Sequence, residues 1–286
     1  MPTITRPDGA TIYYEVHGDG YPLLLIAPGG ISSQVEVWRN GPIDPMRDFA
    51  SDFQVIAMDQ RHAARSLAPA AAFDYDLCAD DQAAVLDAIG ARTAHVMGGC
   101  IGCAHIWRLI QRHGDRITAA IPQNPVGLDE TNTPGTFYAM FSPTMRLARA
   151  DGMKAVADSA VRNPMFMVNN EAGPFAPRIA ADDEFRAKIE SMPVESYVAL
   201  IVRFRDGTWP TGTPFFTATR EWMQQCRTPM LVLPGSDAFH PTSIAHLICE
   251  LAPNARCLDV DCRTPERLAA TIEKVRAFLK SHTPAA

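Results

Sequence analysis

Cys100 is the residue of this sequence with the clearest potential for covalent chemistry. It lies within Gly98-Gly99-Cys100-Ile101-Gly102, where an apolar run that starts at Thr93 ends and a strongly helical segment begins. The pattern predicts a strand, a tight turn and a helix, with small residues that let the turn expose its central side chain. The helix N-terminus would favour a thiolate, and the backbone N–H of Ile101 would point to where an oxyanion forms. The spacing therefore indicates a nucleophilic thiol.

Two other interpretations of this stretch stay open at this point. Cysteine is often simply buried, and glycine-rich turns end many strands that carry no chemistry. Cys100-Ile101-Gly102-Cys103 is also a C-x-x-C at the start of a helix, which is the arrangement of thioredoxin-like redox sites. The rest of the chain has to distinguish a nucleophile from a redox pair or a structural cysteine.

The composition is that of a globular protein that acts on small molecules. The chain has 286 residues, of which 47% are hydrophobic and 20% charged, and its formal net charge is −6. Its 26 Lys and Arg residues form no dense run, so neither nucleic acid nor an anionic membrane is an expected partner. The N-terminal residues do not resemble a signal peptide, and no apolar run approaches the roughly 18 residues of a membrane span. We expect a cytoplasmic protein with a small-molecule substrate, and the sequence leaves open whether it forms a homo-oligomer.

The number of cysteines indicates whether the protein is expected in a compartment where disulfides form. An odd number in a long chain without a recognisable signal sequence predicts free thiols rather than a disulfide framework.

The segments around the elbow predict a doubly wound, mainly parallel sheet. Residues 3–17 are typical of a hairpin turning at Asp8-Gly9, and later apolar runs alternate with helical patterns. The predicted strands are 22–27, 53–59, 93–99, 117–124, 229–235 and 255–260, and the predicted helices are 76–90, 101–113, 242–251 and 265–281. Such alternation places a functional site at the C-terminal ends of the strands.

Residues 126–226 interrupt the alternation and are rich in Pro, Met and aromatic side chains. We interpret them as a mainly helical cap inserted into a core formed by residues 1–125 and 227–286. An apolar cap over the sheet edge would also form an apolar substrate pocket.

The order of these motifs resembles that of the α/β-hydrolase family over nearly the whole chain. The motifs are, in order, the hairpin, Pro28-Gly29-Gly30, Asp59-Gln60-Arg61 with Ser66, the elbow, the cap, and a strand ending at Gly235-Ser236-Asp237. The resemblance implies that Cys100 is the nucleophile, as cysteine is in dienelactone hydrolases, and that Asp237 is the acid of a catalytic triad. It also implies that Gly29, Gly30 and Ile101 supply the N–H groups of an oxyanion hole.

The sequence departs from the family at the catalytic histidine. The family places it after the last strand, where this chain has Asp261-Cys262-Arg263-Thr264. We predict instead that His240 is the general base, because it follows the acid strand at the catalytic edge and lies three residues beyond Asp237. His62 is the alternative base, since its loop also follows the C-terminal end of a strand.

A base of this kind needs a third group to orient it. The candidates are Asp237 itself and the acids after the preceding strand, Asp129 and Glu130. His95, His105 and His113 lie in the elbow strand and its helix, where structural roles are expected.

We therefore expect a hydrolase that uses neither metal nor cofactor and attacks an apolar carbonyl substrate through Cys100, forming an acyl-thioester. Esters, thioesters, lactones and activated C–C bonds all fit this chemistry. The alternatives are a non-hydrolytic protein of the same fold, either a lyase or a ligand-binding protein, and a C-x-x-C oxidoreductase. The oxidoreductase is disfavoured because the thioredoxin fold is small and has no insertion of this length.

Overall fold

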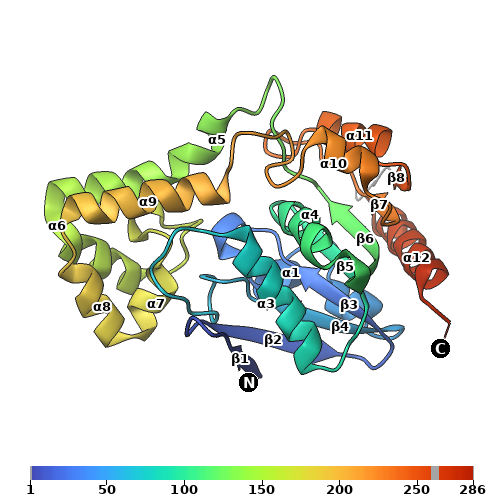
Figure 1. The fold of residues 1–286 in the computed structure, drawn as a ribbon, viewed down its shortest axis with the longest axis horizontal. Helices are drawn as coiled ribbons and strands as arrows, with labels where there is room; N and C mark the ends of the chain where they lie inside the picture. The colour runs from blue at the N-terminus through green and yellow to red at the C-terminus, as the bar shows by residue number, and fades with distance from the viewer. Residues whose placement is uncertain (1, 259–263, 286) are drawn as a thin grey trace.

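The computed structural model describes residues 2–258 and 264–285, and an eight-stranded sheet forms its centre (Figure 1). The strand order is β1-β2-β4-β3-β5-β6-β7-β8. The strands are β1 (Thr3–Thr5), β2 (Thr11–His17), β3 (Tyr21–Ile26), β4 (Phe53–Met58), β5 (Ala94–Gly99), β6 (Ile117–Gln123), β7 (Met230–Val232) and β8 (Ala255–Cys257). β2 is antiparallel to both β1 and β4, whereas all the remaining pairs are parallel. The predicted mainly parallel α/β sheet is confirmed.

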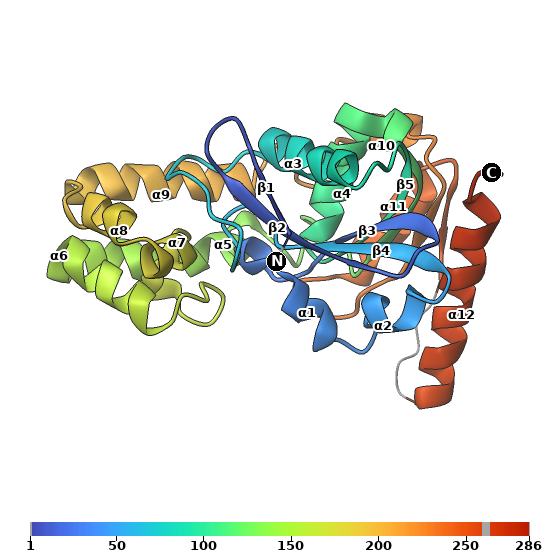
Figure 2. The same ribbon diagram turned by 90° about the horizontal axis from the view of Figure 1, so that it is seen from below.

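Helices cover both faces of this sheet (Figure 2). One face carries α3 (Tyr75–Ala88), α4 (Gly102–His113), α10 (Arg220–Gln225) and α11 (Thr242–Leu251). The other face carries α1 (Val35–Arg39), α2 (Pro45–Phe49) and α12 (Pro265–His282). The layers are those of a doubly wound fold.

The continuous apolar run of β3 shows why the sheet needs two covered faces. Leu24 and Ile26 belong to the core on the α4 side, whereas Leu23 and Leu25 belong to the core on the α12 side. All four side chains are fully buried. Because successive strand residues point to opposite faces, only a strand covered on both sides can bury such a run.

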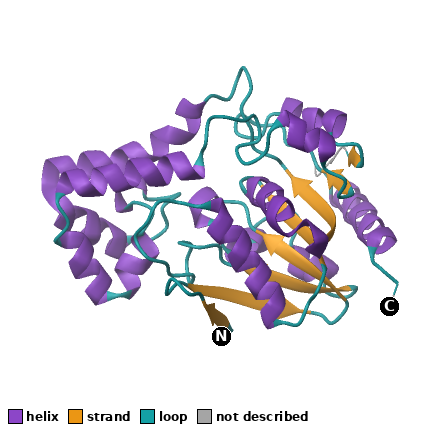
Figure 3. Ribbon diagram, in the orientation of Figure 1, coloured by secondary structure: helices purple, strands orange, loops and turns teal. Residues whose placement is uncertain are grey.

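Residues 126–226 contain most of the remaining helices (Figure 3). These are α5 (Pro134–Tyr138), α6 (Ser142–Arg162), α7 (Ala176–Ala181), α8 (Asp183–Glu190) and α9 (Val194–Thr208), with short 3-10 turns between them. They share a core rich in phenylalanine, which continues into the rest of the chain through Phe73, Tyr75 and Ile101. The last part of the range differs, since Phe215, Met223 and Cys226 pack in the sheet core on the α4 side.

The expectation of free thiols is wrong for one pair of cysteines. Cys249 at the end of α11 and Cys257 at the end of β8 form a disulfide, and their Cα atoms are 6.1 Å apart. The chain turns back between these elements, so residues eight positions apart meet in space. A total count of cysteines cannot reveal such a local pair.

Other expectations are refined or lie outside the described part. Thr242 is the first residue of α11 rather than its N-cap, and its hydroxyl donates to the carbonyl of Gly235 over 2.7 Å. The predicted last strand extended to Val260, and both Val260 and Cys262 lie outside the described residues. Within the described ranges, no helix combines the length and apolar character needed to cross a membrane.

Candidate active site

The turn between β5 and α4 forces Cys100 into an unusual backbone conformation. Its φ is 54°, in the left-handed region that few residues other than glycine adopt. A Cβ at Gly98 would lie 2.7 Å from the carbonyl oxygen of Gly102, and a Cβ at Gly102 would lie 2.5 Å from that of Ile26. The two flanking glycines are therefore required for strand, turn and helix to approach so closely, as the sequence pattern predicts.

The loop after β3 lies beside this elbow because β3 and β5 are parallel neighbours, with Ile26 paired to Gly98. A Cβ at Gly99 would lie 3.2 Å from the ring of Pro28. Gly29 and Gly30 have φ of 116° and 60°, which turn the loop sharply. Ile101 immediately precedes α4, and the first N–H groups of a helix have no partner within it. The structure thus brings both groups of expected oxyanion donors close to Cys100.

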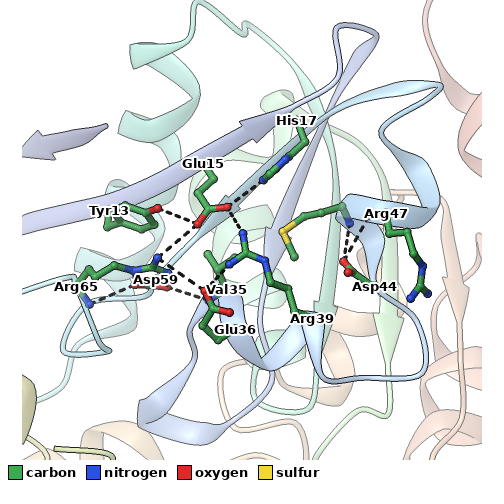
Figure 4. A network of polar contacts seen from close by, with 11 residues as sticks. Tyr13, Glu15, His17, Val35, Glu36, Arg39, Asp44, Arg47, Asp59 and Arg65 are labelled. Carbon is green, nitrogen blue, oxygen red and sulfur yellow. Dashed lines mark hydrogen bonds and ion pairs between the residues drawn. The ribbon is translucent and has the colours of Figure 1, made fainter. Parts of the chain in front are cut away.

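A polar network holds the end of that loop in place (Figure 4). The carboxylate of Asp59, at the end of β4, accepts the backbone N–H of Val35 over 2.8 Å and is bound on its other side by Arg65 at 2.7 and 2.9 Å. Arg65 also reaches Glu15 of β2 at 3.4 Å. Asp59 is completely buried, so this pairing fixes α1 and the preceding loop against the sheet.

His240 and Asp237 form a pair within the loop that follows β7. The imidazole Nδ1 lies 2.8 Å from both carboxylate oxygens of Asp237. The same carboxylate accepts the backbone N–H groups of Phe239 and His240 over 2.8 and 3.0 Å. These bonds tie the acid and the imidazole together in a single turn of the chain.

His240 also interacts electrostatically with Cys100. Burial lowers the pKa of this imidazole, but the interactions with Cys100 and then with the Asp237 carboxylate outweigh it and raise the pKa to about 9. Nε2 is buried, and among the described residues it forms no hydrogen bond of ordinary geometry. Cys100 and His240 are therefore within electrostatic reach of each other without a closed hydrogen bond. Catalytic contacts are often this loose before substrate binds.

Two residues, Gly235 and Asn132, hold the histidine loop in position. A Cβ at Gly235 would lie 2.5 Å from the His240 Cβ, so only glycine lets the loop fold back on itself. The buried Asn132 donates to the carbonyls of Gly127 and Phe239 over 3.1 and 3.3 Å. The bond to Gly127 lies within the segment after β6, whereas the bond to Phe239 connects that segment to the one after β7.

Among the described contacts, the other candidate acids do not bind the imidazole of His240. Asp129 accepts the Ser243 hydroxyl over 2.6 Å and the backbone N–H groups of Thr131 and Asn132. Glu130 is exposed. Of the three acids considered, Asp237 is the one bound to His240.

His62 lies in different surroundings. It is buried between the rings of Phe175 and Phe204, with centroids 5.6 and 5.1 Å away. Burial, followed by the charge of Arg61, lowers its pKa to about 3. A neutral imidazole packed edge-on in an aromatic cluster is a structural group, so the geometry does not support His62 as the base.

The immediate surroundings of Cys100 are apolar. Its partly buried side chain packs against the phenylalanine-rich core, which includes Phe137, Trp209 and Phe216. Phe137 stacks on Trp209 with ring centroids 4.3 Å apart. Among the described residues, no three His, Cys, Asp or Glu side chains converge in a way that could hold a metal ion.

Sequence reasoning missed Asn132 and Gly235 as positioning residues. Asn132 lies in an irregular segment with no pattern to mark it, and its partner Phe239 is 107 residues away. Gly235 lies in the loop three residues beyond the end of β7, and the need for glycine there arises from the position of His240.

The fold and this geometry can be compared with known proteins. The family model described as "alpha/beta hydrolase fold" matches residues 22–167, which is just over half of the chain. The chain belongs to the α/β-hydrolase fold family. The matched part of this hydrolase runs from the start of β3 through the elbow and into the helical segment.

Among curated relatives, a proposed carbamate hydrolase, RutD of Azorhizobium caulinodans, is 28% identical over 261 residues. The match covers 88% of this chain and 87% of that protein. The hydrolase is thus similar to another member of its family over nearly the full length of both chains.

Solved structures agree on the fold. An esterase from a Rhodococcus species is 21% identical, with a TM-score of 0.62 and 99% of both chains covered. The enol-lactonase from Burkholderia xenovorans is 19% identical, with a TM-score of 0.63, covering 98% of this chain and all of that one. At these identities the likeness concerns the fold alone.

Proposed function

We propose that this hydrolase cleaves an apolar carbonyl substrate through a Cys100 nucleophile, with His240 and Asp237 completing the triad. The observation that carries the proposal is the left-handed Cys100 at the elbow, with the Asp237-bound imidazole of His240 on the same edge of the sheet. Names of similar proteins, which include a carbamate hydrolase, an esterase and an enol-lactonase, support a substrate with an acyl or carbamoyl carbon.

The first half-reaction forms an acyl-thioester. The Cys100 sulfur attacks the carbonyl carbon, and the electron pair of the C=O bond moves onto oxygen. In this mechanism the N–H groups of Ile101 and Gly30 bind that oxyanion, as such donors do in other acyl-transfer enzymes. The oxyanion then collapses, the bond to the leaving group breaks, and the His240 imidazolium donates its proton to the departing atom.

The second half-reaction releases the acid. His240, now neutral, accepts a proton from water as the water oxygen attacks the thioester carbon. Collapse of this second oxyanion expels the Cys100 thiolate, which leaves it beside the imidazolium that the water proton has formed. Asp237 holds Nδ1 throughout, so Nε2 is the atom that exchanges the proton.

We further propose that helices α5–α9 act as a cap over this site. Met167 supports this role, because its sulfur would lie 3.2 Å from a Cβ at Gly30 and its N–H lies 3.4 Å from the Ser32 hydroxyl. The aromatic side chains near Cys100 favour an apolar acyl or leaving group.

Trapping the intermediate tests the proposed nucleophile. The protein is mixed with a panel of activated esters, thioesters, lactones and carbamates, quenched during turnover, and analysed by intact mass. We expect an acyl adduct on Cys100 in the wild type, and neither adduct nor turnover in Cys100→Ala. Unfolding curves of the variant show that it is folded.

Cys103→Ala is the matched control, because it removes the neighbouring thiol from the same turn. We expect it to keep most of the turnover and the adduct. Turnover by Cys100→Ala at the wild-type rate would disprove the nucleophile.

A further inference from the structure

Cys103 lies one helical turn from the proposed nucleophile. Its backbone N–H donates to the carbonyl of Cys100 over 3.0 Å, which closes a turn of four residues. The first and last Cα atoms of such a turn lie within about 7 Å. Disulfides usually join Cα atoms about 4.4 to 6.8 Å apart, so the backbone spacing suits a bridge.

The Cys103 side chain lies under the elbow backbone. Its thiol donates to the carbonyl of Gly98 over 3.3 Å and is 3.5 Å from the carbonyl oxygen of Gln123. That Gln123 oxygen also accepts the backbone N–H of Cys100 over 2.9 Å. One carbonyl group therefore contacts both cysteines, although both thiols are free in this structure.

The two thiols differ in their access to solvent. Cys100 is partly exposed and stands at the start of α4, whereas Cys103 is fully buried. Burial, followed by the nearby Cys100, raises the pKa of the Cys103 thiol well above its usual value. An oxidant from solution would thus reach Cys100 first, and Cys103 would act only in a second step.

We propose that Cys100 is a site of reversible oxidation by hydroperoxides and that Cys103 resolves it as an internal disulfide. The proposal rests on the proposed function in one respect, which is the reactive thiol at Cys100. The disulfide switches the hydrolase off and protects its nucleophile from irreversible oxidation.

The chemistry proceeds in two balanced steps. The Cys100 thiolate attacks one oxygen of the peroxide, the O–O bond breaks, and the leaving hydroxide takes the proton of the His240 imidazolium, giving water and a sulfenic acid. The Cys103 sulfur then attacks the Cys100 sulfur, the S–O bond breaks, and the hydroxyl leaves with the Cys103 proton as water. Two thiols lose two electrons in total, and one peroxide is reduced.

The second step requires the Cys103 side chain to leave its present contacts. Cys103 must rotate its side chain away from the Gly98 and Gln123 carbonyls, while Gln123 keeps its bond to the Cys100 N–H. In the disulfide the Cys100 sulfur is no longer available to a substrate. A dithiol reverses the bridge by thiol–disulfide exchange.

Peptide mass mapping tests this directly. Tryptic cleavage after Arg92 and Arg108 gives the peptide 93–108, which contains Cys100 and Cys103 and no other cysteine. The full-length protein is treated with limiting hydrogen peroxide, alkylated and digested. We expect the wild-type peptide to lose two hydrogen atoms and to resist alkylation, and hydrolase activity to be lost and then restored by dithiothreitol.

Cys103→Ala separates this result from simple oxidation. In this variant, or in Cys103→Ser, Cys100 should gain two or three oxygen atoms, and the loss of activity should resist dithiothreitol. Cys226→Ala, which removes a buried free cysteine elsewhere, should behave as the wild type does.

Over-oxidation of Cys100 at the same rate in the wild type and in Cys103→Ala would overturn the proposal, as would a Cys100 inert to peroxide. The mass readout needs no substrate. If the disulfide forms but no substrate is hydrolysed, only the proposed function is contradicted. If substrates are hydrolysed but no disulfide forms, only this inference is contradicted.

Discussion

Cys100 and His240 each hold an unfavourable state that their neighbours stabilise. A non-glycine residue in a sparsely populated region of φ and ψ costs about 1 to 3 kcal/mol, and the packed elbow imposes that cost at Cys100. His240 is largely buried, which disfavours its charged form, yet Cys100 and Asp237 raise its pKa to about 9. Strain and a displaced pKa on facing residues are typical of an active site.

The raised pKa of His240 predicts an upper limit to the pH range of activity. Because the proposed mechanism has the imidazolium donate the proton to the leaving group, turnover of an alkyl ester should fall as pH rises through about 9. In Asp237→Asn the fall should move to lower pH and turnover should drop at least about tenfold, since one group that favours the imidazolium is lost. The shift should be partial because Cys100 remains. Steady-state kinetics across the pH range measures both effects.

An aryl ester with a good leaving group is the matched comparison. Its leaving group needs little proton donation, so its turnover by the same enzyme should fall less at high pH. Identical pH profiles for the alkyl and aryl esters, with no response to Asp237→Asn, would count against His240 as the acid.

At the scale of elements, one loop carries both the acid and the base of the proposed triad, which the family resemblance places in two loops. The segment after β7 carries both Asp237 and His240, which are three residues apart and joined by direct hydrogen bonds. The loop must therefore fold tightly, and Gly235 and Asn132 hold it in that form.

Gly235→Ala should displace the imidazole without touching the substrate. The new methyl group would come within 2.5 Å of the His240 Cβ and 2.7 Å of its carbonyl oxygen, so the loop has to shift. We expect turnover to fall by up to about 100-fold, because small misplacements of a catalytic group have effects of this order. Overpacking should also destabilise the fold by about 1 to 3 kcal/mol. Turnover kinetics and denaturant unfolding measure the two quantities.

Gly212→Ala is the matched control, since no atom lies within 4 Å of a Cβ at that position. It should leave turnover and stability near those of the wild type. Equal effects of the two substitutions would show that steric fit around His240 determines neither turnover nor stability.

At the scale of the whole molecule, several histidines are buried in uncharged form. Burial lowers the pKa of His62 and His105 to about 3 and that of His95 to about 4. His95 lies at the junction of β5 with the C-terminus, and its ring nitrogens contact Thr118 and Thr283 at 2.8 and 3.0 Å. His62 and His105 pack on one aromatic cluster, through Phe204 and Phe73, whereas His95 lies apart from it.

This burial predicts a loss of stability in mild acid. The unfolded chain takes up protons as pH falls through about 6.5, whereas the folded protein does so only near pH 3 to 4. At about pH 5 each histidine should lower the free energy of unfolding by about 2 kcal/mol, or on the order of 5 kcal/mol together relative to about pH 7. His240 acts in the opposite direction, but most of its titration lies above pH 6.5. Urea unfolding at a series of pH values measures the slope.

His105→Phe should reduce the slope of the free energy of unfolding against pH by the contribution of about one proton. The variant should still fold, because phenylalanine can keep the ring contacts with Tyr75 and Phe73. The exposed His246→Ala serves as its control. A free energy of unfolding that does not change between about pH 7 and pH 5 would contradict the prediction.

Local patterns in the sequence were sufficient for the sheet and the elbow. The alternation of apolar runs and helical segments predicted the mainly parallel sheet, because burial on both faces demands such runs. The glycines around Cys100 predicted the turn, because their role is set by atoms a few residues away. The proximity of His240 to Asp237 followed from their spacing for the same reason.

Only the tertiary structure decided which distant groups meet. It paired Cys249 with Cys257, placed His62 among the rings of Phe175 and Phe204, and set Asn132 against the histidine loop. Each of these depends on how separate elements pack, and chain connectivity alone does not fix such packing. The placement of Cys103 beneath Cys100 shows both contributions, since the sequence provides the spacing and the folded turn decides where each thiol points.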